Sequence, residues 1–249
     1  MSFPNTIYGK YGWEKVQTSD QRQKLGTRMS FDDGRVFRYC EVGGSDIAAG
    51  AIVQAPAGIA NHDMDLAIAT AASGVTSLTV TLGGTASTKN QYKDGYLYVN
   101  DGTGEGSIYK IKSNAAGSSG STCVITLDEE DGTVTAVTNG TTLVGLAVNP
   151  YSNVIISPTT VTNVAVGVAP RALTSDYYGW LQTWGAASVL CNAAGVIGEA
   201  VRVGGTSTAG GFEDLDRDGS NENEQVIGHQ MLIASVATDY ALIDLNIAP

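Results

Sequence analysis

Short strand-like runs separated by glycine-containing turns constrain this chain more than any other feature. The sequence holds 31 glycines among 249 residues, and glycine readily adopts the positive φ angles that tight turns need. Between the turns, Val- and Thr-rich runs alternate apolar and polar residues, which suits a pleated surface with one buried face. Residues 75–82 show this alternation, with Leu78, Val80 and Leu82 on one face. The pattern predicts an all-β fold.

Further strands are predicted along the whole chain. An Asp-Gly turn precedes a strand that ends at residue 39, and a hairpin joins 95–100 to 107–112 around the glycine-rich turn 101–106. The other predicted strands are 123–127, 143–148, 177–185, 187–191, 199–203, 226–236 and 240–247. One short helix is expected at 61–73, where Asn61 caps an alanine-rich run that ends at Gly74.

We expect three parts along the chain. Residues 1–30 are polar and predict an extended N-terminal arm. Residues 31–170 predict a β-rich domain that contains the short helix, and residues 171–249 predict a small C-terminal β-barrel or sandwich. The segment 151–170 contains Pro158 and ends at a second proline, so we expect an edge strand or an extended connector there.

Charge is distributed unevenly between the arm and the rest of the chain. Residues 1–38 carry seven Lys/Arg against four Asp/Glu, although the whole chain has a net charge of −11. An acidic body repels nucleic acid and anionic membranes, so neither is an expected partner. The basic arm indicates docking on a complementary protein surface, with a frayed, solvated terminus as the alternative. The candidate contact residues are Tyr8, Tyr11, Trp13, Arg22, Lys24 and Arg28.

Nothing in the sequence indicates secretion or membrane insertion. The first residues lack the apolar segment of a signal peptide, and no apolar run is long enough to span a bilayer. We therefore expect synthesis in the cytoplasm. Cys40, Cys123 and Cys191 are widely spaced and odd in number, which predicts buried free thiols instead of disulfides or a zinc site.

No pattern of catalytic residues stands out, so we expect a protein that is not an enzyme. His62 is expected to face solvent beside the predicted helix cap, and His229 to lie at the edge of a strand. No serine stands in a nucleophile-elbow pattern. The glycine-rich turn at 102–106 lies between two strands, whereas a phosphate loop leads into a helix.

An acidic loop carries the only local metal-binding pattern. Asp214, Asp216 and Asp218 precede Gly219 with the spacing of the first half of a calcium loop. Gln225 stands where such a loop usually closes with Glu, and strands instead of helices are expected on both sides. The loop is therefore either a Ca²⁺ site or a solvated acidic turn, and no other cofactor is expected.

The aromatic strand at 177–184 has two interpretations. Its aromatic residues Tyr178, Trp180 and Trp184 share one face, opposite Leu181. They either form the core of a small barrel or lie exposed, where they can stack on sugars or anchor a partner protein.

Several segments resemble tailed-phage head decoration (cement) proteins and related virion structural proteins. In the C-terminal part these are residues 177–185, 187–190, 198–201, 226–228 and 240–243. Residues 25–28, 33–39, 90–95 and 104–111 resemble structural proteins of marine and cyanobacterial phages. The acidic loop is not part of the family pattern.

This resemblance implies a virion protein without catalytic residues. Its partner would be the major capsid protein, and it would stabilise the head from the capsid exterior, often as a homotrimer. The alternative is another virion part, such as a tail, fibre or host-binding β module, with Trp180 or Trp184 exposed for glycans. A hydrolase that uses His62 or His229 is the third hypothesis.

Overall fold

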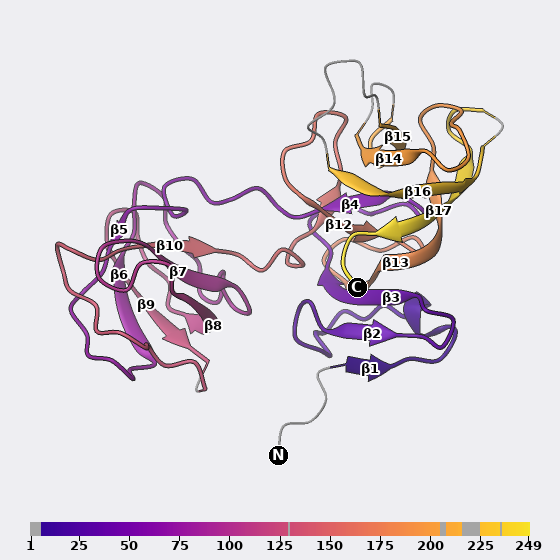
Figure 1. The fold of residues 1–249 in the computed structure, drawn as a ribbon. Coiled ribbons are helices and arrows are strands. Elements are labelled where there is room, and N and C mark those ends of the chain that lie inside the picture. Colours follow the sequence, from indigo (N-terminus) through magenta and orange to yellow (C-terminus); the bar gives the residue numbers. More distant parts are fainter. Residues whose placement is uncertain (1–5, 129, 205–207, 216–224, 235) are drawn as a thin grey trace. The chain divides into compact units, whose positions relative to one another are not determined.

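The computed structural model describes residues 6–128, 130–204, 208–215, 225–234 and 236–249. In these residues the chain forms strands β1 to β17 and one short 3-10 helix, η1 (Figure 1). The predicted all-β class is confirmed. None of the described helices is long and apolar enough to cross a membrane.

The chain divides into two compact units, and one is inserted into the other. Unit 1 comprises Met1–Ala57 and Pro150–Pro249, and unit 2 comprises Gly58–Asn149. The expected division into 31–170 and 171–249 is therefore wrong. β4 of unit 1 pairs with β11, which lies beyond the insertion, and Gln54 stands opposite Ile155. The two ends of the insertion therefore leave from one antiparallel strand pair.

Unit 2 is a small sheet that curls back on itself. Its strands are β5 (Leu66–Ala67), β6 (Ser77–Thr81), β7 (Tyr96–Asp101), β8 (Ile108–Asn114), β9 (Thr122–Leu127) and β10 (Leu143–Ala147). They lie in the order β5-β10-β7-β8-β9-β6, and Ile68, just after β5, bridges to Val80 of β6. The inward side chains form one apolar core, which includes Leu78, Val80 and Leu82 as predicted. The predicted hairpin is β7–β8.

The predicted helix at 61–73 does not form. Asn61 and Asp65 adopt positive φ angles of 64° and 59°, which no α-helix allows. The segment instead makes turns, followed by β5 and a bridge to β6. His62 is fully buried, so its expected exposure is also wrong.

Unit 1 contains the larger sheet. Its elements are β1 (Thr6–Tyr8), η1 (Trp13–Lys15), β2 (Arg28–Ser30), β3 (Val36–Glu41), β4 (Ile52–Gln54), β11 (Ile155–Ile156), β12 (Ala165–Val168), β13 (Tyr178–Leu190), β14 (Ala200–Val203), β15 (Phe212–Asp214), β16 (Val226–Leu232) and β17 (Tyr240–Asn246). The strand order is β1-β2-β3-β13-β17-β16-β14-β15, and β12 links β13 to β4. The sheet nearly closes, since Ile52 of β4 donates its N–H to the carbonyl of Gly210, close to β15. Apolar side chains from both halves of the sequence fill its interior.

One long strand, β13, replaces the two strands predicted at 177–185 and 187–191. Its first half pairs with β3 and its second half with β17. Gly185 lies between the two halves with a φ of 80°. The buried carboxamide of Gln182 donates to the carbonyls of Trp184, Gly185 and Ala186 at 3.2, 3.3 and 2.9 Å, which holds the bend. The glycine is therefore a bend within a strand and not a strand end.

Residues 6–30 are not an extended arm. β1 pairs in parallel with β2, and β2 pairs with β3, so this segment extends the sheet of unit 1 (Figure 1). Thr18 and Tyr178 exchange two backbone hydrogen bonds, which ties the intervening loop to β13. The mildly basic segment is therefore part of the folded unit from residue 6 onward.

Candidate interaction surface

Three aromatic side chains in the N-terminal segment of unit 1 are exposed. Tyr8, Tyr11 and Trp13 are 78%, 61% and 46% exposed, and Val16 beside them is also exposed. We call these four residues the aromatic face. Exposed Trp and Tyr side chains offer large, stiff, apolar areas with a polar tip, which are typical anchors of protein interfaces.

An apolar groove of about 340 Å³ begins at Trp13 and Val16. Its floor is built from an aromatic cluster in which Tyr39 stacks on Tyr178 at 6.1 Å and meets Trp180 edge-on at 5.0 Å. The complete lining is Ile7, Trp13, Val16, Thr18, Arg22, Gln23, Met29, Tyr39, Tyr178 and Trp180. The groove can accept apolar side chains from another molecule.

The groove is held rigidly by hydrogen bonds. The Tyr39 hydroxyl accepts from the backbone N–H of Arg22 at 3.0 Å, and the Tyr178 hydroxyl donates to the Glu41 carboxylate at 2.9 Å. Burial and the bond to Glu41 raise the pKa of the Tyr178 phenol, which therefore stays neutral and keeps donating. Such a preformed surface loses little conformational entropy when a partner binds.

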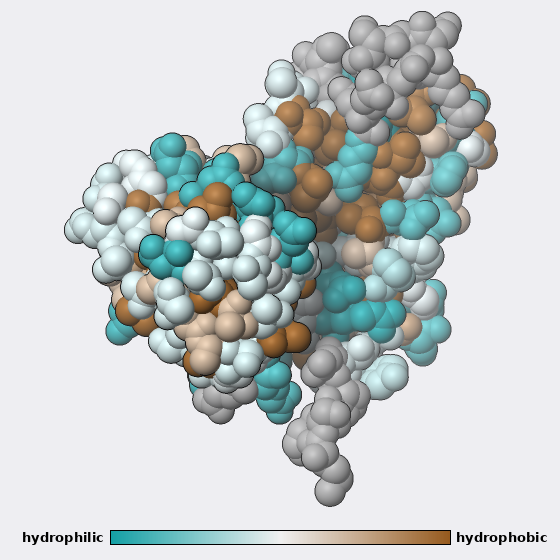
Figure 2. Space-filling model, turned by 60° about the vertical axis from the view of Figure 1, so that its left-hand side comes forward, coloured by the Kyte–Doolittle hydropathy of each residue, from teal (hydrophilic) through white to brown (hydrophobic). Residues whose placement is uncertain are grey.

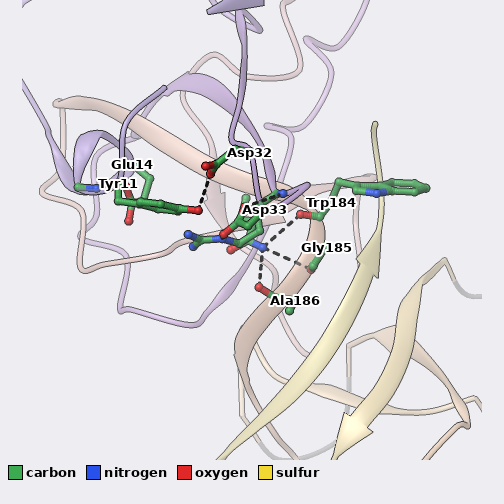
Figure 3. A network of polar contacts seen from close by, with 10 residues as sticks. Tyr11, Glu14, Asp32, Asp33, Trp184, Gly185 and Ala186 are labelled. Atoms are coloured by element: carbon green, nitrogen blue, oxygen red, sulfur yellow. Dashed lines mark hydrogen bonds and ion pairs between the residues drawn. The ribbon is translucent and has the colours of Figure 1, made fainter. Parts of the chain in front are cut away.

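Tyr11 lies in a second, more polar cavity. This cavity has a volume of about 690 Å³ and is also lined by Glu14, Lys15 and Arg35. The Tyr11 hydroxyl donates to Asp32 at 2.5 Å, as Figure 3 shows, and the Arg35 guanidinium lies 5.8 Å from the centre of the Tyr11 ring. In the same view the indole of Trp184 points away from this network.

The six predicted contact residues do not form one continuous site. Trp13 and Arg22 share the apolar groove, and Tyr11 lines the polar cavity. Lys24 is exposed and Arg28 is half-buried, and neither lines either cavity. Tyr8 is exposed on β1. The predicted contact residues Trp13 and Arg22 therefore lie in the groove together with Tyr178 and Trp180 of the aromatic strand, whereas nothing in the sequence indicated that Tyr39 joins them.

The aromatic strand combines both of its interpretations. Trp180 is only 8% exposed and packs in the core with Tyr39, while Leu181 packs in a different core cluster, as the alternation predicts. Trp180 nevertheless supplies part of the groove floor. Trp184 is half-buried. Neither Trp180 nor Trp184 is an exposed platform for a sugar.

Unit 1 also carries exposed apolar residues away from the aromatic face. On the side that Figure 2 shows, apolar residues (brown) gather in a broad area of unit 1. One set of exposed apolar residues, the apolar strip, consists of Val196, Ile197, Met231, Leu232 and Ile233. A hydrogen bond from the Gly198 N–H to the Gln230 carbonyl at 2.8 Å brings its two segments together. Such strips often mark surfaces that another protein covers.

The other sequence candidates lie elsewhere. His62 belongs to unit 2 and is buried, whereas His229 is exposed on β16 of unit 1. Asp214 ends β15, while Asp216 and Asp218 lie outside the described residues. Within the described ranges, no group of three His, Cys, Asp or Glu side chains could hold a metal ion. The three cysteines are buried and free, as predicted.

Comparison with protein-family models, with curated proteins and with solved structures gave no match.

Proposed function

We propose that this chain is a non-enzymatic phage capsid decoration (cement) protein. It binds the outer surface of the assembled major capsid protein lattice and stabilises the head. The observation that carries this proposal is the aromatic face, with its preformed apolar groove, on the basic N-terminal segment of an acidic chain. The sequence resemblance to phage head proteins supports the identity of the partner.

The chemistry of the face suits a protein partner with an acidic, partly apolar surface. Trp13 and Val16 border a groove that takes apolar side chains, and Arg22 at its rim provides positive charge. Tryptophan, tyrosine and arginine are enriched among the residues that dominate interface energies. Attraction between unlike surfaces speeds docking and favours one orientation.

Oligomerisation would strengthen such binding. In a trimer, three copies of the face bind one lattice together, and each further contact forms at a high effective concentration. The apolar strip provides a surface that subunit association can cover. A mass in solution of three times 25.8 kDa would support this part of the proposal.

The binding test uses purified capsids and the double variant Tyr8→Ala/Trp13→Ala. Loss of two interface anchors costs about 2 kcal/mol or more, so capsid affinity should fall about 30-fold. Val134→Ala is the control, since Val134 is 81% exposed but lies in unit 2. Unchanged binding of the double variant would refute the role of the face.

The cementing test compares particles with and without the protein. Particles that carry it should open at a higher temperature, and particles decorated with the double variant should open like bare ones. Equal heat stability of decorated and bare particles would remove the cementing role. Binding to host glycans instead of capsids would favour a tail or host-binding module.

A further inference from the structure

A buried carboxamide without partners lies next to the first residue of the acidic loop. Gln230 on β16 is only 2% exposed, and both side-chain polar atoms lack a hydrogen-bond partner among the described residues. Its backbone is fixed on both sides, since its N–H donates to the Glu199 carbonyl at 3.0 Å and its carbonyl accepts from Gly198 at 2.8 Å. An unpaired amide in such a position costs free energy unless a ligand satisfies it.

The Asp214 carboxylate faces the same point. Its Oδ2 accepts from the backbone N–H of Val196 at 3.1 Å, whereas its Oδ1 is buried and has no partner in the described part of the chain. A Cβ placed on Gly195 would lie 2.0 Å from Gln230 Oε1 and 2.6 Å from Asp214 Oδ1. The sum of these distances, 4.6 Å, is the largest possible separation of the two oxygens.

Two oxygen acceptors that face each other need a positive charge or a proton between them. Asp214 is partly buried, and the negative charge of Glu199 lies close enough to act on it. A rotated Gln230 carboxamide would donate to Asp214 but would leave the Asp214 charge uncompensated beside Glu199. A cation satisfies both oxygens and neutralises the charge.

We propose that Asp214 Oδ1 and Gln230 Oε1 are two ligands of a Ca²⁺ site at the base of the acidic loop. Carboxylate and amide oxygens are the ligands that Ca²⁺ prefers, at about 2.3–2.6 Å, and two oxygens up to 4.6 Å apart can share one ion. The site is independent of the proposed capsid binding.

The affinity test titrates Ca²⁺ into the full chain after treatment with a chelator, by calorimetry. Wild type should bind with a Kd of about 10⁻⁴–10⁻³ M, the range of extracellular calcium modules. Asp214→Asn and Gln230→Met should each weaken binding at least about 10-fold. Asp244→Asn is the matched control, because it removes an exposed carboxylate from the neighbouring strand β17. Its affinity should stay within about twofold of wild type, since Asp244 is not a ligand.

Thermal unfolding separates binding from folding. Without calcium, Asp214→Asn should be at least as stable as wild type because it removes a buried charge beside Glu199. Gln230→Glu should lower the metal-free midpoint and bind Ca²⁺ more tightly, because it adds a second charge to the same pocket.

Two results would overturn the site. The first is no heat of binding and no midpoint shift in wild type up to about 10 mM Ca²⁺, ten times above the Kd of the weakest calcium modules. The second is wild-type affinity in both Asp214→Asn and Gln230→Met, whether or not an Asp216→Asn/Asp218→Asn variant loses binding.

Discussion

A buried histidine–tyrosine pair in unit 2 allows the contribution of one hydroxyl group to the free energy of unfolding to be measured. His62 and Tyr92 are both fully buried, and the Tyr92 hydroxyl contacts Nδ1 of His62. Nε2 of His62 lies 2.8 Å from the Thr85 carbonyl, which can only accept. Nε2 therefore carries the proton, Nδ1 is the acceptor, and the tyrosine donates. Tyr92→Phe leaves a buried acceptor without a donor.

The expected cost follows from this geometry. A buried polar group that loses its partner costs about 1–3 kcal/mol, and we take about 2 kcal/mol because the imidazole cannot reach water. Unit 2 spans Gly58–Asn149. For a unit of this size the loss lowers the unfolding midpoint by about 8–16 °C.

The assay can follow the two units separately. All three tryptophans, at positions 13, 180 and 184, belong to unit 1, so tryptophan fluorescence reports on unit 1 alone. Far-ultraviolet circular dichroism reports on both units. Tyr92→Phe should lower the midpoint of the unit 2 transition, which circular dichroism detects and tryptophan fluorescence does not. The midpoint of the fluorescence transition should stay unchanged.

The control is Tyr96→Phe, which removes a hydroxyl from a half-exposed ring in the same unit. It should change stability by less than about 0.5 kcal/mol. A Tyr92→Phe midpoint within 2 °C of wild type, or an equal loss in the control, would refute the assigned hydrogen bond.

Four further outcomes are expected. Burial raises the pKa of Tyr92 above its ordinary value, so its stabilising contribution is complete below about pH 10 and declines above it; Tyr92→Phe should flatten the fall of the urea midpoint between pH 9 and 11. Burial raises the pKa of Cys40 to about 12, so a thiol reagent at pH 8 should react with it only after unfolding. Gly145→Ala places a methyl 2.4 Å from a carbonyl oxygen and should cost about 1–3 kcal/mol by urea unfolding, unlike Gly58→Ala, which has open space. Deletion of residues 58–149 with a short Gly-Ser link should leave unit 1 with its native tryptophan emission, and a red-shifted, unfolded emission would show that unit 1 needs the insertion.

Period-two patterns predicted the strands well because side-chain alternation is a local property. Ala241, Ile243 and Leu245 alternate inward on β17, and the Asp-Gly turn at 33–34 leads into β3 as predicted. Pairing between distant strands is not local. No pattern in β13 could indicate that its first half pairs with β3 and its second half with β17.

The predicted helix at 61–73 failed because its local preference is weak. Alanine favours a helix by less than about 1 kcal/mol per residue, and tertiary contacts readily outweigh that amount. Leu66 and Ile68 are buried two positions apart, which is a strand spacing. Asn61 and Asp65 tolerate positive φ better than most residues, so they support turns as well as a helix cap. Polar residues before an apolar run are therefore compatible with a helix cap and with a turn that leads into a strand.

The groove shows why the candidate surface was only half predictable. Exposed aromatic residues in a polar segment, such as Trp13, can be recognised one at a time. The floor depends on Tyr39 and Trp180, which come from strands far apart in the sequence and meet only after pairing. The alternation of the aromatic strand allows either a core or an exposed role, and Trp180 combines the two because a core residue can also form the base of a groove.

The insertion of unit 2 into unit 1 is marked in the sequence by two prolines, but they can be interpreted only once the strand pairing is known. Pro56 and Pro150 stand beside the two junctions of the insertion, and proline is common in linkers between domains. Either proline alone is an ordinary loop residue. They become a pair because β4 and β11 are adjacent and antiparallel, so the chain leaves and returns at one place. A hairpin whose loop is replaced by a domain keeps both strand ends together, and the entropy of closing the loop rises only slowly with its length, so the host sheet can fold around a long insertion.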